Sequence, residues 1–383
     1  MISNIIKKFF PSCLLCCGAA AALTACVNDD TDFSAYINEQ APTSSNDTIR
    51  ILYSGTTATV SGDSHGIVSI NGADVTVNDP TSTSAMVLVL SGTTPNGSLL
   101  VYRSLKYEVV LNGVSITNAD GPAINNQCGK AFHLTLANGT VNTLTDGTVY
   151  AEQSYDQKGT LFSEGQIYVE GTGALNVNGN GKNGIASDDY VIFRSGTVNV
   201  NVAATGSNGV KVNDGFTIEG GTLNIDVKAD GARGIRNEAR TTIAGGNTTI
   251  TTSGDCKIET LDGIVDTTSC AGIKSDSLFV MTAGTLTITS TGDGGKGINC
   301  TENIELSGGT MVVTTTGDND MSKPKALKSD TGIIVSGGSL TATVSKSWAC
   351  DNGTESDEPA DRITIIGTPV TKTLTKKLVK VQF

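Results

Sequence analysis

The chain has 383 residues, with 26 Lys and Arg against 38 Asp and Glu, and a formal net charge of −12. This acidic balance argues against nucleic acid as a partner, because phosphate binding depends on excess positive charge. The two histidines, His65 and His133, lie far apart and have no Cys or Glu at metal-ligand spacing, which argues against zinc sites and His-based triads. His133 alternates with apolar neighbours, so we expect it to face outward on a strand.

Residues 1–25 have the pattern of a secretion signal. Lys7 and Lys8 precede an apolar run over residues 9–23, and the run ends in small residues before Cys26. This order resembles a lipoprotein processing site, so we predict that Cys26 becomes the lipidated first residue of the mature protein. An ordinary cleaved signal with an incidental cysteine is the alternative.

Residues 26–47 are predicted to be a flexible tether, because they are rich in Asn, Asp, Thr and Ser and lack apolar periodicity. Asn28, Asp29 and Asp30 lie just after Cys26, and they resemble an acidic tag that sends some lipoproteins to the outer face of the cell. We therefore expect a lipid-anchored protein at the outer membrane or cell surface, with the membrane as a partner through its anchor.

A repeat of about 25 residues dominates the rest of the chain. The spacings between its glycine steps are 25, 25, 38, 25 and 29 residues, and the spacing of 38 indicates one insertion. A period of this length with strand-forming residues is typical of a solenoid. The steps lie at Gly196, Gly221, Gly246, Gly284, Gly309 and Gly338.

Three short segments in each repeat alternate apolar and polar residues, which predicts three strands per coil. In one coil the inward residues would be Val191 and Phe193, then Val198 and Val200, then Val210. The predicted fold is therefore all-β, a right-handed single-stranded parallel β-helix over residues 48–350 with about 25 residues per coil. Residues 351–383 should form a polar loop and a segment that closes the C-terminal end.

Five cysteines remain beyond Cys26, so at least one stays unpaired within the chain. Cys256 and Cys270 flank the insertion, and we predict them as the best disulfide pair in an exported protein, without excluding free thiols.

Distinctive motifs occur in seven segments, at residues 111–116, 121–124, 138–147, 161–163, 171–175, 184–188 and 272–276. These segments resemble a carbohydrate-binding β-helix family related in fold to pectate lyases, whose founding members bind cellulose and polygalacturonate. The resemblance covers roughly residues 48–345 and implies a calcium-dependent, non-catalytic, polysaccharide-binding protein. Arg233-Gly234 and Lys296-Gly297 depart from the family, which has Asp-Gly at those positions, and Asp230 and Asp293 stand three residues earlier.

The third strand of each coil carries the predicted binding residues. Each residue after an inward apolar position must face solvent, which gives a column of cations, and two residues further on the same face carries acids. The cations suit the carboxylates of a uronic-acid chain, and the acids suit Ca²⁺, which prefers oxygen ligands. The predicted ligand-binding residues are Lys211, Arg236, Lys274 and Lys328, and the predicted Ca²⁺ ligands are Asp188, Asp230, Asp276, Asp293 and Asp330.

Three functions remain open at this point. Calcium-supported, non-catalytic binding of an acidic, pectin-like polysaccharide is the first, with polygalacturonate or cellulose as the partner. A lyase is the second, since Lys211, Arg236 or Lys274 could act as the base. A structural surface protein or adhesin is the third, in which the charged columns are a solvated ladder of weak pairs. Trp348 could stack on a sugar, although we expect it to cap the last coil.

Overall fold

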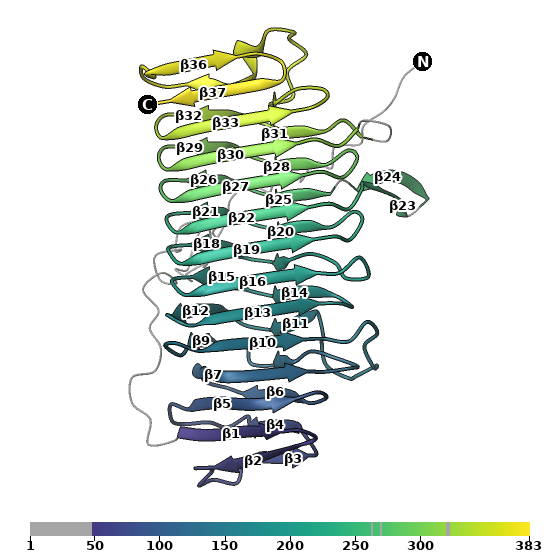
Figure 1. Cartoon of the computed structure of the whole chain (residues 1–383), viewed down its shortest axis with the longest axis vertical. Coiled ribbons are helices and arrows are strands. Elements are labelled where there is room, and N and C mark those ends of the chain that lie inside the picture. Colours follow the sequence, from purple (N-terminus) through teal and green to yellow (C-terminus); the bar gives the residue numbers. More distant parts are fainter. Residues whose placement is uncertain (1–47, 262, 269, 319–321) are drawn as a thin grey trace, which may run out of the picture. The chain divides into compact units, whose positions relative to one another are not determined.

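The structure is a computed structural model that describes residues 48–261, 263–268, 270–318 and 322–383. The predicted signal peptide, Cys26 and the predicted tether lie outside these residues. Among these described residues, the regular elements are β-strands and one short 3-10 helix, η2 (Pro359–Arg362). No described helix has the length and apolar character to cross a bilayer. The strands stack into a column (Figure 1).

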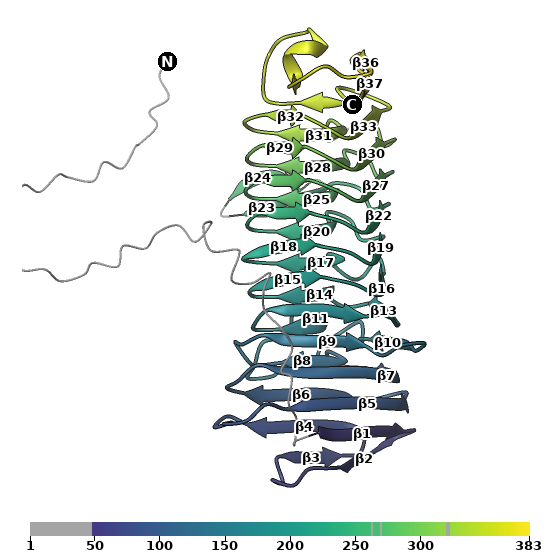
Figure 2. The ribbon, with the colours of Figure 1, turned by 90° about the vertical axis from the view of Figure 1, so that its left-hand side faces the viewer.

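The column is a parallel β-solenoid of about 11 turns with ~25 residues per turn, so the predicted fold class is confirmed. Three stacks of strands run along it, which we call sheets 1, 2 and 3 (Figure 2). Sheet 1 consists of β10 (Val141–Thr145), β13 (Ala174–Gly179), β16 (Thr197–Val202), β19 (Thr222–Val227), β22 (Asn247–Thr252), β27 (Thr285–Ser290), β30 (Thr310–Thr315) and β33 (Ser339–Val344). Sheet 2 consists of β9 (Phe132–Leu136), β12 (Ile167–Gly171), β15 (Tyr190–Phe193), β18 (Gly215–Ile218), β21 (Thr241–Ile243), β26 (Phe279–Met281), β29 (Ile304–Leu306), β32 (Ile333–Val335) and β35 (Thr364–Ile365).

Sheet 3 carries the predicted binding residues. Its strands are β3 (Val68–Asn71), β4 (Asp74–Asp79), β6 (Ser98–Arg103), β8 (Ile124–Asn126), β11 (Gly159–Ser163), β14 (Asn183–Ser187), β17 (Val210–Val212), β20 (Arg233–Asn237), β25 (Ala271–Ser275), β28 (Lys296–Cys300), β31 (Lys325–Ser329) and β34 (Cys350–Asp351). In the first coils, sheets 1 and 2 merge through the longer strands β1 (Thr48–Ser54), β5 (Val87–Thr94) and β7 (Tyr107–Thr117).

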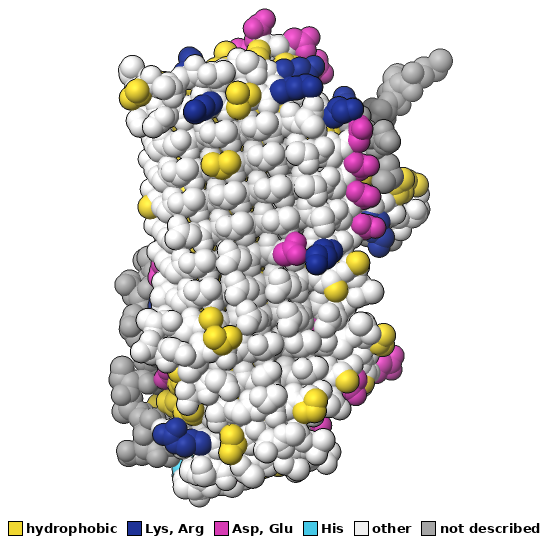
Figure 3. All heavy atoms as spheres, in the orientation of Figure 1, with side chains coloured by type: hydrophobic (Ala, Val, Ile, Leu, Met, Phe, Trp, Pro, Cys, Tyr) yellow, Lys and Arg dark blue, Asp and Glu magenta, His cyan; other side chains and the backbone are white. Residues whose placement is uncertain are grey.

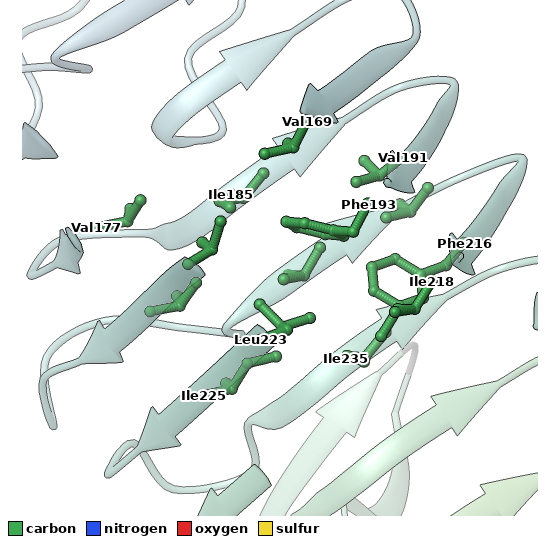
Figure 4. Close-up of a cluster of buried hydrophobic side chains, with 14 of the residues drawn as sticks. Val169, Val177, Ile185, Val191, Phe193, Phe216, Ile218, Leu223, Ile225 and Ile235 are labelled. Atoms are coloured by element: carbon green, nitrogen blue, oxygen red, sulfur yellow. The ribbon is translucent and has the colours of Figure 1, made fainter. Parts of the chain in front are cut away.

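The core fills the centre of the column, with side chains from all three sheets. The predicted inward residues Val191, Phe193, Val198, Val200 and Val210 are all buried, and the same holds one coil further on (Figure 4). Because successive coils pair in parallel register, like residues stack on like, and each coil completes the core of its neighbour.

Two glycine columns allow the coils to turn and stack. At the step before sheet 1, Gly221 has a φ of +75°, a conformation that other residues rarely adopt. In sheet 3, a Cβ atom on Gly234 would lie 2.3 Å from Cγ2 of Ile250 and 2.6 Å from the carbonyl oxygen of Gly272. Glycine is therefore required there by close packing between coils.

The insertion and the two ends depart from the parallel pattern. An antiparallel hairpin of β23 (Lys257–Leu261) and β24 (Ile264–Thr268) accounts for the spacing of 38 residues. At the N-terminal end, β2 (Thr57–Ser61) pairs antiparallel with β1, and β3 pairs antiparallel with β4. At the C-terminal end, β37 (Leu378–Gln382) pairs antiparallel with β33 and with β36 (Thr371–Leu374). These strands cover edges that would otherwise be open to pairing.

Candidate functional site: a charged strip on sheet 3

The predicted cations lie in one outward column on sheet 3, which Asn299 interrupts between Lys274 and Lys328. Strand register aligns Lys211 with Arg236, Arg236 with Lys274, Lys274 with Asn299, and Asn299 with Lys328. Their inward neighbours are buried in the core, so the alternation of the strand turns these side chains to the surface. The structure therefore brings the four predicted ligand-binding residues together on one face.

Each of these cations has an acidic partner from the same face. The side chains of the four cations are between 20% and 34% exposed, so the pairs are partly shielded from water. We call this arrangement the charged strip. Its ion pairs are Lys211 with Glu238 at 3.2 Å, Arg236 with Asp276 at 2.6 Å, Lys274 with Asp276 at 3.0 Å and Lys328 with Asp330 at 2.7 Å.

Asp276 lies at the centre of the strip between two cations. Partial burial alone would raise the pKa of its carboxyl, but hydrogen bonds and charges from Arg236 and Lys274 hold that pKa below its ordinary value. Asp276 is thus a carboxylate already neutralised by two protein groups. A cation bound at this position would have to displace one of them.

A different group of carboxylates lies at the N-terminal end of the strip. Oxygen atoms of Asp156, Glu164 and Asp188 lie within 4.8 Å of one another, the one such cluster among the described residues. Lys158 pairs with Asp156 at 2.7 Å and also with Asp188. Burial raises the pKa of the Glu164 carboxyl, and the charge of Asp188 raises it further. Three carboxylates that share one lysine are a donor set that suits Ca²⁺.

Of the predicted calcium ligands, only Asp188 belongs to this acidic cluster. Asp156 and Glu164 were missed because they lie outside the regular repeat, in the loop before β11 and in the turn after it. The intervals between Asp156, Glu164 and Asp188 in the sequence do not match the spacing of a known metal-binding motif. The loop of residues 146–158 brings Asp156 back to sheet 3, and the sequence carries no signal for that path.

Asp230 and Asp293 lie outside the charged strip. They belong to a ladder along the turns that follow sheet 1, and Figure 3 shows acidic side chains in a row on that edge. In this ladder a carboxylate oxygen accepts the backbone N–H of the equivalent residue in the next coil. The bonds run from Asp255 to Asp230 at 3.0 Å, from Asp293 to Asp255 at 2.8 Å and from Asp318 to Asp293 at 2.7 Å. The predicted metal ligands therefore divide between two edges of the column.

Trp348 and His133 are both engaged by protein groups. The Cζ atom of Arg362 lies 3.9 Å from the centre of the Trp348 ring, and Nζ of Lys376 lies 4.7 Å from it. His133 alternates with core residues as expected, but it is buried. Its ring stacks on Tyr168 with centres 4.8 Å apart, and Nδ1 lies 3.4 Å from a carboxylate oxygen of Glu170.

Cys256 and Cys270 are free thiols in the structure, so the predicted disulfide is not present. Burial raises the pKa of the Cys270 thiol to about 11, which keeps it protonated and unreactive. Burial also lowers the pKa of nearby Lys296 to about 8. The Lys296 ammonium donates to the carbonyl oxygens of Gly294 at 2.7 Å and Lys323 at 2.8 Å, and to the Ser322 hydroxyl at 2.9 Å.

Two comparisons with known proteins bear on this site. The chain is 32% identical over 126 residues to a carbohydrate-binding domain-containing protein of Acetivibrio thermocellus, a match that covers 32% of this chain and 44% of the relative. The chain thus spans less than half the length of that relative. The solved structure of a polysaccharide lyase-like protein from C. thermocellum is similar, with a TM-score of 0.54 and 24% identity. The match covers 66% of this chain and 94% of the chain in that structure. That likeness establishes the shared fold.

The family profile described as "Carbohydrate-binding domain-containing protein" matches residues 71–235 and 231–321, which is most of the described column. Those residues include the acidic cluster and most of the charged strip. The chain belongs to the carbohydrate-binding domain-containing protein family.

Proposed function

We propose that this protein is a non-catalytic polysaccharide-binding protein that holds an acidic, pectin-like glycan along the charged strip with the help of Ca²⁺. Membership of a carbohydrate-binding family supports polysaccharide as the class of partner. We also propose that a lipid on Cys26 anchors the protein at the outer membrane or cell surface.

The acidic cluster is the observation that carries the calcium proposal. Asp156, Glu164 and Asp188 gather three carboxylates around one point, and Lys158 alone offsets them. A divalent cation would relieve the repulsion that raises the pKa of Glu164. Because Ca²⁺ takes six to eight oxygen ligands, three protein carboxylates leave positions for the carboxylate of a uronic acid.

The cations of the strip would then meet further carboxylates of the same glycan. Lys211, Arg236 and Lys274 lie on consecutive coils, so their charges repeat along the column. Each is held by an acid at 2.6–3.2 Å, and a glycan carboxylate would compete with that acid for the same donors. This competition predicts weak binding per sugar and affinity built from many contacts.

A lyase is the alternative function, and the lysines of this chain do not favour it. A lyase base must be neutral and must reach the substrate. The lysines of the strip form ion pairs with carboxylates of the same chain, so a substrate would have to displace those carboxylates to reach them. Burial lowers the pKa of Lys296 and Lys325, but these side chains are only 5% and 7% exposed and bind protein groups.

The test is binding of the full chain, in detergent, to polygalacturonate with Ca²⁺ and with a chelator, with parallel detection of unsaturated sugar products. We expect calcium-dependent retention without product. The variant Asp188→Asn should weaken retention at least about tenfold, because it removes a calcium ligand. The control Asp226→Asn makes the same charge change on sheet 1 and should bind normally.

Three other outcomes would contradict this proposal. Unsaturated product would convert the protein into a lyase. If neither the chelator nor Asp188→Asn changed retention on polygalacturonate, the calcium site would be refuted. No retention on any acidic or neutral glycan would leave a structural surface protein or adhesin.

A further inference from the structure

The outward face of sheet 1 is almost free of charge. Seven strands from β13 to β33 each present three outward residues, and 18 of these 21 positions are Asn, Thr or Ser. The exceptions are Ala174, Val312 and Asp226. We call this surface the Asn/Thr face. Its columns are Thr197, Thr222, Asn247, Thr285, Thr310 and Ser339; then Asn176, Asn199, Asn224, Thr249, Thr287 and Thr341; then Asn178, Asn201, Thr251, Thr289, Thr314 and Thr343.

The face is flat and regular. Figure 3 views it directly and shows a broad field of uncharged polar side chains, with most charges at the edges and ends of the column. Register is unbroken from β13 to β33, so each residue lies directly over its equivalent. Outward residues repeat about every 6.6 Å along a strand and about every 4.8 Å between strands. The result is a two-dimensional lattice of hydroxyl and amide groups.

Strand propensity does not account for this composition. Thr favours strands, but Asn is depleted in them, and five Asn residues occupy the second and third columns. Coil geometry does not exclude charge either, because the outward side of sheet 2 carries Glu170, Arg194 and Glu219 in adjacent coils. A typical soluble surface has about 25–35% charged residues. The absence of charge is therefore a property of this face.

Such a face is suited to contact with an uncharged partner. Charged groups are costly to dehydrate, whereas hydroxyls and amides exchange water for a partner's hydroxyls at small cost. Thr is stiff at χ1, and Asn side chains are already held in a ladder, with Asn199 donating to Asn176 at 2.9 Å and Asn224 donating to Asn199 at 2.9 Å. Little side-chain entropy is then lost on binding.

The size of the face argues for a polymer array. Its lattice spans about 13 Å by about 29 Å, or about 380 Å², which is less than the ~800 Å² per partner of a stable protein interface. Its outward columns contain no aromatic residue or Arg, the residues that anchor protein partners and single sugars. Affinity must then come from many similar contacts made together, which only a repetitive surface provides.

We propose that the Asn/Thr face binds an ordered, uncharged, hydroxyl-rich polysaccharide, contacting several parallel chains at once. This inference rests on the proposed function only for the class of partner, because it uses a different face and needs neither Ca²⁺ nor cations. The protein would thus hold neutral, ordered glycan on sheet 1 and acidic glycan on sheet 3.

The test is retention of the full chain, in detergent, on microcrystalline cellulose, an ordered uncharged polymer, with soluble cello-oligosaccharides as competitors. We expect retention that is unchanged by chelator and resists competition, because a single chain covers only part of the lattice. The triple variant Asn224→Lys, Thr249→Lys, Thr287→Lys places three charges on the central column. It should lower the partition constant at least about tenfold, since each charge must be dehydrated on contact.

Two further variants keep the result interpretable. Asn224→Thr, Thr249→Asn, Thr287→Asn changes the same residues without adding charge and should retain binding. Thr249→Lys alone adds one charge at an exposed position and should give an intermediate loss, which remains informative if the triple variant folds poorly.

Four outcomes would overturn the inference. These are no retention of the wild type on cellulose, equal retention of the lysine triple variant, full competition by soluble oligosaccharides, and loss of retention that follows a dimer-to-monomer change in light scattering. The last would make the face a contact between two copies of the chain. Loss of polygalacturonate binding with intact cellulose retention would refute only the proposed function.

Discussion

The outward sides of sheets 1 and 3 are built by the same coils and differ in chemistry. In the coil that contains β19 and β20, sheet 1 presents Thr222 and Asn224, while sheet 3 presents Arg236. The inward residues Leu223 on sheet 1 and Ile235 on sheet 3 are equally buried and apolar. The core therefore constrains only alternate residues, and the outward residues of the two sheets differ for reasons outside the core.

The side chains of the two faces also make different contacts with one another. On the Asn/Thr face, amides bond to equivalent amides one coil away. On the charged strip, Lys211 and Arg236 form ion pairs with acids one coil away, and Lys274 and Lys328 form ion pairs with acids of their own coil. An amide ladder leaves no net field, whereas a strip of ion pairs leaves local fields that respond to salt, pH and bound ions.

The largest expected effect comes from breaking the coil that both faces share. Gly234→Ala places a Cβ atom 2.3 Å from Ile250 and 2.6 Å from the carbonyl oxygen of Gly272. Because a backbone atom cannot move away easily, we expect a loss of about 1–3 kcal/mol in unfolding free energy, measured by urea denaturation. Binding at both faces should weaken together.

Gly129→Ala is the matched control for this substitution. A Cβ atom on Gly129 would meet no atom within 4 Å, and its backbone does not require glycine. Its stability should change by less than about 1 kcal/mol. Equal effects of the two substitutions would mean that glycine at residue 234 is not required by packing between coils.

The sequence predicted the inward side of this molecule well and the outward side only in part. Burial imposes a strict alternation, so residues such as Val198 and Ile218 could be assigned to the core from the repeat alone. The same alternation placed Lys211 on the surface without indicating that its ammonium meets Glu238. Whether a surface cation binds its own chain or a ligand depends on its rotamer and its neighbours, which cannot be predicted from the sequence repeat.

The acidic residues show the same limit more sharply. Asp188 and Asp230 both follow regular strands. They lie on different edges of the column because Asp188 follows β14 of sheet 3, whereas Asp230 follows β19 of sheet 1. The acidic cluster needs Asp156, which an irregular loop supplies. A repeat predicts what every coil shares, and a site at one end of the charged strip depends on what one coil has alone.

The acidic cluster should make calcium binding depend on pH. Burial and the charge of Asp188 raise the pKa of Glu164 above its ordinary 4.5. The folded protein therefore keeps a proton on Glu164 over a range where the unfolded chain has lost it. Without calcium, the unfolding free energy should fall as pH rises through that range. Calcium binding should strengthen over the same range, because the ion needs the ionised carboxylate.

Calorimetric titration of Ca²⁺ at several pH values above 4.5 checks this prediction, with Glu164→Gln as the comparison. The variant should bind Ca²⁺ more weakly and lose much of the pH dependence. Retention on cellulose should not follow pH in this way, since the only carboxyl among the outward residues of the Asn/Thr face is Asp226. Identical pH profiles for calcium binding in wild type and variant would show that Glu164 is not a ligand.

Substitutions on the two faces should differ in how their effect on the unfolding free energy depends on salt, and this is the smallest effect that we expect. Asn199→Ala removes two hydrogen bonds, one to Asn176 and one from Asn224, each at 2.9 Å. At a partly exposed site we expect a loss of about 1 kcal/mol in unfolding free energy, and the loss should be the same at low and at 1 M NaCl because no ion pair is involved. Asn224→Ala removes only the bond to Asn199 and should cost about half as much.

Arg236→Gln is the counterpart on the charged strip, where it removes the ion pair with Asp276. Its destabilisation at neutral pH should shrink as NaCl is added, because screening weakens the interaction it deletes. It should also raise the pKa of Asp276, which NMR titration would detect. If Asn199→Ala became salt-dependent while Arg236→Gln did not, the two faces would not be stabilised as their contacts indicate, and the assignment of neutral glycan to one and acidic glycan to the other would lose its physical basis.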